Sequence, residues 1–503
     1  MKAPATLVEL LERGPGQRTA IIVPELKLRV TYDALRSQVM TMAEVLAAAG
    51  IHPGNRVATV LPNGLPAIVT FLAASLAGTA APLNPAYPYE ELFFYLGDTS
   101  AHVLLCPPHG AEQARSAAAD RAIRVFTVEM DSQGTVHLVE RQQRAEVTPP
   151  SPEQVALILH TSGSTGRPKR VPLLHSNLAQ SATNIAEAFS LSQYDVSFCI
   201  MPLFHIHGLM ASTMAALLSG GTVVVPTKFN PLTFWQTVRE YDITWYSGVP
   251  TMHQLLLTRA RGHKHHRSGL RFIRSASAPL APEVIHKMEE IFGVPFVEAY
   301  GMTEASHQMS SNPLPPRKRK PGSVGPATGI EISIMDNKGK HLPQGQRGEV
   351  VIRGPSVFRG YENNPEANAA AFVHGWFRTG DQGMLDEDNY LHLTGRIKDL
   401  IIRGGENVAP REIDEVLLRH PAVAEAVAFG MPHPVLGEEV AAAVVLHEPG
   451  GAHETALIKH CRDRLAEYKC PKKIFLVQSI PLTATGKIRR QQVAAALLDG
   501  QLL

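Results

Sequence analysis

The sequence predicts an α/β protein with a large N-terminal body of parallel β/α sheets plus a small β-rich region, followed by a small C-terminal α/β domain. Its 503 residues suggest about three domains, or one large and one small, because domains average roughly 150 residues. Hydrophobic residues (44%) and charged residues (19%) occur at globular frequencies, which excludes a collagenous, coiled-coil or wholly disordered chain. Short apolar runs also alternate with segments of helical length, an order typical of a parallel sheet covered by helices.

The first α/β region extends from about residue 28 to residue 128, with an expected strand at Val57–Leu61 and an expected helix at Ala67–Ala77. The same alternation returns between about residues 155 and 300, where turn residues bound short apolar runs. These runs predict buried strands at Val155–Leu159, Thr222–Val225, Ile243–Tyr246, Leu270–Ile273 and Phe296–Val297. Leu209–Leu218 is expected to be a buried helix. Pro282–Phe292 is expected to be a helix as well, because a proline opens it and Gly293 follows it as a stop.

After Gly348 the chain changes to short strands and turns, with expected strands at Glu349–Arg353 and Tyr390–Leu393. From Arg396 onward a compact unit of strands and helices is expected. Its helices are predicted at Pro410–Arg419 and Glu454–Ala466, and its strands at Val423–Phe429 and Val440–Leu446. We therefore predict an N-terminal domain at 1–395, a hinge at 396–398 and a C-terminal domain at 399–503.

Charge and cysteine content exclude several kinds of protein. The 48 Lys and Arg residues nearly balance 46 Asp and Glu residues, and a net charge of +2 is too small for a nucleic-acid binder that works through bulk charge. Four scattered cysteines form neither a disulfide framework nor a thiolate metal site, which fits a reducing compartment. Pro202, His205 and Gly220 interrupt the apolar stretch 196–229, so no membrane span is expected. We expect a soluble, cytoplasmic protein whose basic clusters at 263–267 and 317–320 are solvated loops.

A loop rich in glycine and hydroxyl groups follows the strand predicted at Val155–Leu159. Its sequence is His-Thr-Ser-Gly-Ser-Thr-Gly-Arg-Pro-Lys, residues 160–169. Glycines let the backbone approach a ligand closely, and hydroxyl and N–H groups can solvate phosphate oxygens, while Arg167 and Lys169 supply positive charge. It is not a Walker A loop, because no Gly-Lys-Ser/Thr follows four residues after a glycine. For this loop alone, a flexible Ser/Gly turn is a competing interpretation.

Five further motifs follow in order along the chain. They are Tyr300-Gly301-Met302-Thr303-Glu304, Trp376-Phe377-Arg378-Thr379-Gly380-Asp381, Gly395-Arg396-Ile397-Lys398-Asp399, Arg403-Gly404-Gly405-Glu406-Asn407 and Pro481-Leu482-Thr483-Ala484-Thr485-Gly486-Lys487. With the loop at 160–169, this set resembles the adenylate-forming superfamily of acyl-CoA synthetases, firefly-type luciferases and peptide-synthetase adenylation domains. The resemblance covers essentially the whole chain. One departure is Arg170, which replaces the usual glycine after the loop lysine.

The resemblance implies a two-step reaction. A carboxylate joins the α-phosphate of ATP with release of pyrophosphate, and the CoA thiol then attacks the acyl-adenylate with release of AMP. It also implies Mg²⁺ on Thr165 and Glu304, which are hard oxygen ligands. The nucleotide site that it implies consists of Thr161, Ser162, Gly163, Ser164, Thr165, Gly166, Lys169, Ser277, Ala278, Pro279, Ala299, Tyr300, Gly301, Met302, Thr303, Asp381, Arg396 and Lys487.

The resemblance further implies a C-terminal domain that moves between the two steps. The hinge would be Lys398, and Gly404-Gly405 would line the CoA pantetheine tunnel after the rotation. The implied catalytic residues are Lys487, Thr165, Glu304 and His205. Lys487 is the principal one for adenylation, because one charge about 4 Å from a phosphate is worth roughly 4 kcal/mol at an effective dielectric near 20.

The residues expected around the acyl group are polar, since His205, His207, Ser277 and His307 fall at those positions. Burying unpaired imidazoles and hydroxyls against an apolar chain costs about 1–3 kcal/mol each, so a small acid with a second carboxylate is favoured. Because the superfamily commonly has a histidine at the place of His205, the inference depends on His207 and His307. The segments 202–209 and 298–313 resemble oxalate–CoA ligases, and Ala299 stands where malonyl-CoA synthetases typically carry an arginine. We therefore expect oxalate, bound by His207, Ser277 and His307.

Three alternatives stay open at this point. The chain is otherwise a medium-chain or aromatic acyl-CoA synthetase, or an adenylation module that loads a carrier protein. From a different class, it is a non-catalytic nucleotide-binding regulator that kept the fold. Retention of Lys169, Glu304, Asp381, Arg396 and Lys487 argues against such a regulator.

Overall fold

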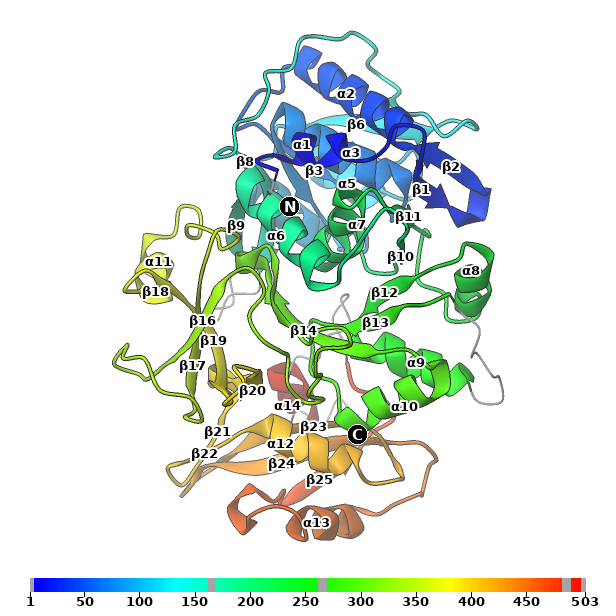
Figure 1. Cartoon of the computed structure of the whole chain (residues 1–503). Coiled ribbons are helices and arrows are strands. Elements are labelled where there is room, and N and C mark those ends of the chain that lie inside the picture. The colour runs from blue at the N-terminus through cyan, green and yellow to red at the C-terminus, as the bar shows by residue number, and fades with distance from the viewer. Residues whose placement is uncertain (1–3, 162–167, 261–268, 482–489, 499–503) are drawn as a thin grey trace.

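A computed structural model describes residues 4–161, 168–260, 269–481 and 490–498 (Figure 1). A seven-stranded sheet forms the first part of the N-terminal body. In spatial order its strands are β7 (Val136–Leu138), β6 (Arg124–Met130), β5 (Val103–Cys106), β3 (Arg56–Thr59), β4 (Thr79–Pro82), β8 (Val155–Thr161) and β9 (Lys169–Leu174). The pairs in the middle of the sheet are parallel, whereas β6–β7 and β8–β9 at its edges are antiparallel.

An eight-stranded sheet forms the second part of the body. Its strands lie in the order β15 (His307–Ser311), β14 (Phe296–Met302), β13 (Phe272–Ser275), β12 (Trp245–Gly248), β10 (Val196–Phe198), β11 (Thr222–Val224), β1 (Thr19–Val23) and β2 (Leu28–Thr31). Again the interior pairs are parallel and both edge pairs are antiparallel. This is the mostly parallel, helix-covered architecture that the alternating pattern predicts.

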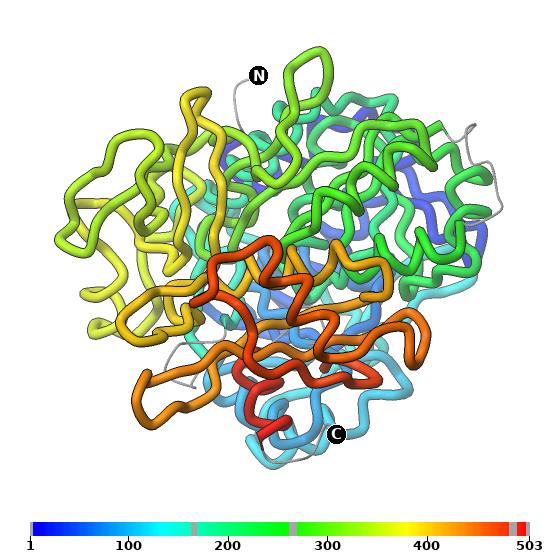
Figure 2. The backbone as a smooth tube through the Cα atoms, turned by 90° about the horizontal axis from the view of Figure 1, so that it is seen from below, coloured from blue at the N-terminus to red at the C-terminus, as the bar shows by residue number. Residues whose placement is uncertain are grey.

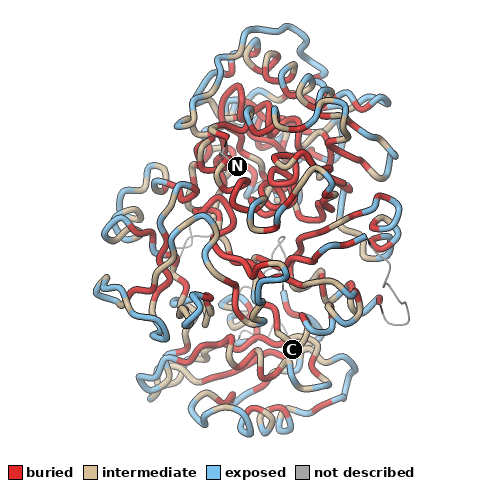
Figure 3. The backbone as a smooth tube through the Cα atoms, in the orientation of Figure 1, coloured by how far each residue is buried: buried red, intermediate tan, exposed pale blue. Residues whose placement is uncertain are grey.

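Helices cover both sheets and join their cores. They are α1 (Leu7–Glu12), α2 (Tyr32–Ala48), α3 (Leu65–Ala77), α4 (Tyr89–Asp98), α5 (Glu112–Ala119), α6 (His175–Ala188), a π-helix (His207–Met214), α7 (Ala215–Leu218), α8 (Phe234–Glu240), α9 (Pro250–Ala260) and α10 (Pro282–Phe292). One apolar core contains residues of α2, α3, α6 and α7 together with strands of both sheets (Figure 3). Because α3 is apolar all round, it is buried on nearly every side.

The predicted β-rich region is a five-stranded antiparallel sheet that begins earlier than Gly348. Its strands are β16 (Glu331–Met335), β17 (Gly348–Arg353), β18 (Phe372–Val373), β19 (Trp376–Leu385) and β20 (Leu391–Arg396), with helix α11 (Pro365–Ala371) beside them. The strand β20 pairs with β19 and ends at Arg396, after which a short 3₁₀ turn (Ile397–Asp399) leads out of the sheet.

The chain then forms a C-terminal sheet with its own apolar cores. Its elements are β21 (Ile401–Arg403), β22 (Glu406–Val408), α12 (Pro410–Leu418), β23 (Val423–His433), β24 (Gly437–Leu446), α13 (Glu454–Arg462), β25 (Lys473–Leu476) and α14 (Arg490–Leu498). This part lies across one end of the N-terminal body (Figure 2). Two polar contacts join this part to the N-terminal body: Arg411 Nη1 donates to the Leu393 carbonyl at 2.9 Å, and Arg419 pairs with Glu283 at 3.0 Å. The domain limits 1–395, 396–398 and 399–503 stay predictions.

The differences between expected and observed elements have local causes. The helix Pro282–Phe292 has the predicted bounds. The strand predicted at Ile243–Tyr246 lies instead at Trp245–Gly248, because the Ile243 N–H donates to Val238 at the end of α8. The helix predicted to end at Ala466 stops at Arg462, where Arg464 and Leu465 both turn back to donate to the Cys461 carbonyl. The predicted helix Leu209–Leu218 is the π-helix followed by α7, and it starts two residues earlier.

Within the described part of the chain, no helix is both long enough and apolar enough to cross a membrane. The basic cluster at 263–267 lies within 261–268, outside the described residues. In the second cluster Arg319 pairs with Glu289 at 2.7 Å, and Lys320 pairs with Asp386 and Asp388 at 2.6 Å each.

Candidate active site

The two ends of the predicted phosphate loop are held by a β-hairpin. Thr161 is the last residue of β8 and Lys169 the first of β9, and the two are paired across the hairpin. The loop residues between them, including Ser162, Gly163, Ser164, Thr165 and Gly166, lie outside the described residues. The Lys169 ammonium lies 4.6 Å from the centre of the Tyr361 ring, a distance at which an aromatic face attracts a cation.

Arg170, the departure from the superfamily pattern, clamps the base of this hairpin. Its guanidinium donates to the Asp98 carbonyl and lies 3.3 Å from a carboxylate oxygen of Glu362. Asp98 also accepts from His160 at 2.9 Å, and this bond, more than the nearby arginine charges, lowers the pKa of Asp98. The contacts tie both strands of the hairpin to the end of α4, so Arg170 anchors the loop rather than lining it.

Glu304 faces the end of β8 from the opposite sheet. It lies in a 3₁₀ turn (Thr303–Ala305) after β14 and is 5% exposed. Its Oε1 accepts from the Tyr361 hydroxyl at 2.9 Å, and Thr161 Oγ1 lies 3.5 Å from the same oxygen. Burial, with the Glu304 charge, raises the pKa of Tyr361, so the phenol stays a donor. A carboxylate beside a hydroxyl is a hard-oxygen donor set of the kind that Mg²⁺ prefers, so Glu304 and its described surroundings fit the implied metal, whereas Thr165 lies outside the described residues.

Asp381 and Arg396 face each other across neighbouring strands. They are paired in the register of β19 and β20, and Arg396 Nε lies 2.7 Å from Asp381 Oδ1. Tyr300, from the end of β14, donates its hydroxyl to Asp381 Oδ2. The Asp381 charge raises the pKa of Arg396, and burial raises the pKa of Tyr300. Three residues from separate motifs thus form one hydrogen-bonded group.

The turn between β14 and β15 brings residues predicted to bind adenine close to one predicted to bind the acid. Ala299, Tyr300, Gly301 and Met302 end β14, Thr303 begins the 3₁₀ turn, and the chain returns through His307 on β15. A Cβ at Gly301 would lie 1.8 Å from the His307 carbonyl oxygen, so only glycine allows this approach. Ser277, Ala278 and Pro279 follow β13, the neighbouring strand, which places them at the same edge of the sheet.

The three residues predicted to bind the acid are in contact. His207 and His307 are buried, and their rings stack with centroids 4.8 Å apart at 26°. Ser277 Oγ lies 3.0 Å from His207 Nδ1. Ser277 and His307 both have positive φ values, +75° and +110°, a conformation that non-glycine residues adopt at a cost and that often marks a functional site. His205 lies next to this group, and its Nδ1 accepts from the His207 N–H at 3.2 Å.

Arg274 and Ser247 also belong to this group, although the sequence analysis assigned them no role. Arg274 is fully buried at 0% exposure on β13, and its Nη2 lies 3.1 Å from His307 Nε2 and 3.0 Å from Gln308 Oε1. Its Nη1 donates to Ser247 Oγ at 2.7 Å, and Ser247 Oγ lies 2.7 Å from His207 Nε2. The available signal was an arginine inside a wholly buried strand, Phe272–Ser275.

The other predicted residues lie on the C-terminal side of Arg396. Lys398 is in the 3₁₀ turn that leaves β20. Gly404 and Gly405 form the turn of the β21–β22 hairpin, with φ values of +58° and +90° that favour glycine. Lys487 lies outside the described residues.

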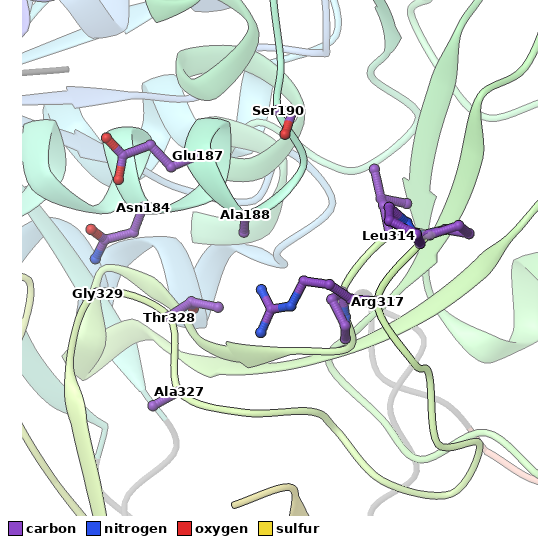
Figure 4. Close-up of a pocket in the computed structure, with 12 residues that line it drawn as sticks. Asn184, Glu187, Ala188, Ser190, Leu314, Arg317, Ala327, Thr328 and Gly329 are labelled. Atoms are coloured by element: carbon purple, nitrogen blue, oxygen red, sulfur yellow. The ribbon is translucent and has the colours of Figure 1, made fainter. Parts of the chain in front are cut away.

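A separate pocket of about 360 Å³ lies beside the C-terminal end of α6 (Figure 4). Its walls include Glu187 from α6, Arg317 from the segment after β15, and Thr328. It contains none of the residues predicted to bind ATP or the acid, and we assign it no role.

Glu298, just before the adenine segment, is a buried carboxyl next to the C-terminal domain. Burial raises the pKa of Glu298 to about 8, although the Gly322 N–H and Arg411 oppose the shift. A carboxyl whose pKa is raised on folding stabilises the fold fully below its ordinary pKa of 4.5, and this contribution is lost as the pH rises toward 8. A neutral side chain of the same shape at position 298 carries no such penalty, so the free energy of unfolding of such a variant increases relative to that of the parent as the pH rises.

We expect Glu298→Gln to melt higher than the parent at about pH 8, by roughly 2–4 °C for each kcal/mol of relieved penalty, and near the parent at about pH 5. Thermal unfolding at both pH values measures this. Glu349→Gln is the control, because it replaces another buried carboxylate that pairs with Arg378. An equal effect of Glu298→Gln at both pH values contradicts the raised pKa.

Comparisons with known proteins agree with this geometry. The family model described as AMP-binding enzyme matches residues 9–362, and that of the AMP-binding enzyme C-terminal domain matches residues 412–487. The chain is 44% identical to an oxalate–CoA ligase of Arabidopsis thaliana, with 94% of each chain covered. It is 38% identical to a sulfoacetate–CoA ligase of Cupriavidus necator, with 93% of each covered. ATP-bound MatB from Rhodopseudomonas palustris is 31% identical over 99% of both chains with a TM-score of 0.91, and apo MatB gives 0.79.

Proposed function

This chain belongs to the AMP-binding enzymes and is an ATP-dependent acid–CoA ligase, and from that premise we propose that its acid is oxalate. The reaction is oxalate + ATP + CoA → oxalyl-CoA + AMP + diphosphate. The observation that supports this choice is the contact of the buried His207 and His307 with the half-buried Ser277. The identity to an oxalate–CoA ligase adds to it.

The polarity of this group favours a small dianion. An apolar chain beside these residues would leave the Ser277 hydroxyl, whose oxygen lies 3.0 Å from His207 Nδ1, without an acceptor for its hydrogen, at a cost of about 1–3 kcal/mol. A carboxylate oxygen of oxalate can accept that hydrogen bond. Ala299 supplies no cation to pair with the second carboxylate of a longer diacid. The stacked rings of His207 and His307 place two imidazoles side by side.

In the first step one carboxylate oxygen of the acid attacks the α-phosphorus of ATP, and the bond from that phosphorus to the bridging oxygen of diphosphate breaks. Thr161 and Lys169 hold the phosphates from the two ends of the phosphate loop, which also contains residues 162–166. Glu304 and Thr165 would hold Mg²⁺, which would offset phosphate charge when bound. Lys487 stabilises the charge that develops on the transferring phosphate.

The nucleoside part of ATP lies along the edge formed by β13 and β14. Asp381 accepts from the ribose hydroxyls, and Arg396 and Tyr300 orient its carboxylate. Ser277-Ala278-Pro279 and Ala299-Tyr300-Gly301 form the two walls of the adenine slot, with Met302 and Thr303 completing the turn.

In the second step the CoA thiol attacks the acyl carbonyl, a thioester bond forms and AMP leaves. The C-terminal domain rotates at Lys398 between the steps and brings Gly404-Gly405 to the pantetheine tunnel. His205, beside His207, is the remaining predicted catalytic residue and borders the acyl group during this transfer.

The test is AMP release by the purified enzyme with CoA over a panel of acids. The panel contains oxalate, malonate, sulfoacetate, a medium-chain fatty acid and a cinnamate. We expect oxalate to have the highest kcat/KM by at least about tenfold, because the longer acids leave donors unpaired. Preference for a monocarboxylic or aromatic acid overturns the assignment, and preference for sulfoacetate keeps the anionic site but replaces its substrate.

Two variants connect that result to the site. We expect Ser277→Ala and His307→Ala each to raise KM for oxalate by about 10–100-fold, the effect of losing one hydrogen bond to a charged group. KM for ATP should change little in His307→Ala, whereas Ser277 also lies in the wall of the adenine slot, so its variant tests the acid site through KM for oxalate alone. Steady-state kinetics with each substrate varied in turn distinguishes these effects, and equal losses for both substrates in His307→Ala would place His307 elsewhere than at the acid.

A further inference from the structure

Arg274 is a buried cation whose described partners are all uncharged groups. Its guanidinium lies near Ser247, His207, His307 and Gln308, and none of the described carboxylates forms an ion pair with it. Burial lowers the pKa of Arg274 to about 9, which leaves it protonated at neutral pH. A buried charge without a counter-ion is costly, so its retention beside the acid site calls for a reason.

The guanidinium fixes the direction of the hydrogen bonds around it, because arginine only donates. At 3.1 Å from Arg274 Nη2, the Nε2 of His307 must accept. On the other side Arg274 Nη1 donates to Ser247 Oγ at 2.7 Å, so the hydroxyl hydrogen of Ser247 is available for His207 Nε2, also at 2.7 Å. Arg274 Nη1 is itself 3.3 Å from His207 Nε2, a position at which a hydrogen on that nitrogen would oppose a second donor.

We infer that Arg274 is a positioning residue that holds His207 and His307 as neutral imidazoles with their hydrogen on Nδ1. The inference rests on the proposed function only for the identity of the anion, since the tautomers follow from the hydrogen bonds of the enzyme alone. His207 Nδ1–H then donates to Ser277 Oγ at 3.0 Å, and the Ser277 hydroxyl hydrogen is directed away from His207.

A relay of donors follows, running from Arg274 through Ser247, His207 and Ser277 toward the bound carboxylate. Each bond polarises the next, so the arginine charge strengthens the last donor without touching the acid. A direct ion pair would hold the attacking carboxylate by its charge. The relay binds the anion through neutral donors, which leaves its oxygens less neutralised and therefore more nucleophilic.

The experiment uses Ser247→Ala, which cuts the relay between Arg274 and His207 and leaves Arg274 in place. Ser197→Ala is the matched control, because Ser197 is an equally buried serine on the neighbouring strand β10 that donates to the Ser212 carbonyl. Imidazole ¹⁵N shifts of the ligand-free full-length enzyme report the tautomers, with signals assigned by His207→Gln and His307→Gln. Steady-state kinetics report KM for the acid and for ATP.

We expect Nδ1–H tautomers for both histidines in the parent and in Ser197→Ala. In Ser247→Ala the loss of the bond from Ser247 should raise KM for oxalate by roughly 10–100-fold, with KM for ATP within about twofold, whereas Arg274 Nη1, 3.3 Å from His207 Nε2, should keep His207 in its Nδ1–H form. Arg274→Lys keeps the positive charge but loses the pair of guanidinium N–H donors that contact Ser247 and His307, and it should disturb the His307 tautomer. If that variant does not fold, Ser247→Ala still decides the question.

An Nε2–H tautomer of either histidine in the parent overturns the inference, as does a Ser247→Ala enzyme with the acid KM of Ser197→Ala. Failure of the oxalate proposal gives a different result. The tautomers and the Ser247→Ala effect would persist, measured with whichever acid the enzyme prefers.

Discussion

Lys487→Ala is expected to lose adenylate formation by about a thousandfold while thioester formation from supplied acyl-adenylate stays near the parent rate. The reason is the charge that this lysine contributes in the first step, worth roughly 4 kcal/mol at about 4 Å from a phosphate. In the proposed mechanism the domain that carries it rotates away before the second step. Pyrophosphate release measures the first half-reaction, and conversion of synthetic oxalyl-adenylate with CoA measures the second.

Lys473→Ala is the matched control, because Lys473 is a half-exposed lysine of the same domain that pairs with Glu454 at 3.2 Å. It should leave both half-reactions within about twofold, as expected for a surface ion pair worth little. Equal losses of both half-reactions in Lys487→Ala would contradict the two-conformation mechanism.

Glu304→Gln is expected to reduce adenylation by about a hundredfold to a thousandfold and to raise the Mg²⁺ concentration needed for half-maximal rate. The change keeps the size of the side chain and its bond from Tyr361 but removes the anionic charge that favours a divalent cation. The measurement is pyrophosphate release over a MgCl₂ titration at saturating ATP and acid.

Tyr361→Phe separates the charge of Glu304 from its orientation. It removes the hydroxyl that donates to Glu304 Oε1 at 2.9 Å and leaves the carboxylate in place. Loss of that bond should cost about tenfold or less, with the Mg²⁺ dependence close to that of the parent. If Glu304→Gln keeps the parent Mg²⁺ dependence, the residue does not hold the metal.

Much of the site can be predicted from the sequence because its residues lie in short motifs at fixed places relative to strands. The loop at 160–169, the Tyr300–Glu304 turn and Asp381 with Arg396 each carry their chemistry within a few neighbouring residues. The family and the α/β fold follow from these motifs and from the alternation of apolar runs. The exact ends of the elements cannot be predicted from this alternation. They depend on hydrogen bonds that the pattern does not show, namely those of the Ile243 N–H and the Cys461 carbonyl.

By itself the sequence determined the family, the reaction class and the polar character of the proposed acid site, since these depend on residue types at regular spacings. Only the tertiary structure shows that Arg274 and Ser247 form hydrogen bonds with the histidines of this site. Arg274 contacts His207 from 67 positions away in the chain, and His307 from 33. Hydrogen-bond direction depends on which donors meet which acceptors, and here the fold brings together strand β13, strand β15 and the π-helix, which are distant segments of the chain.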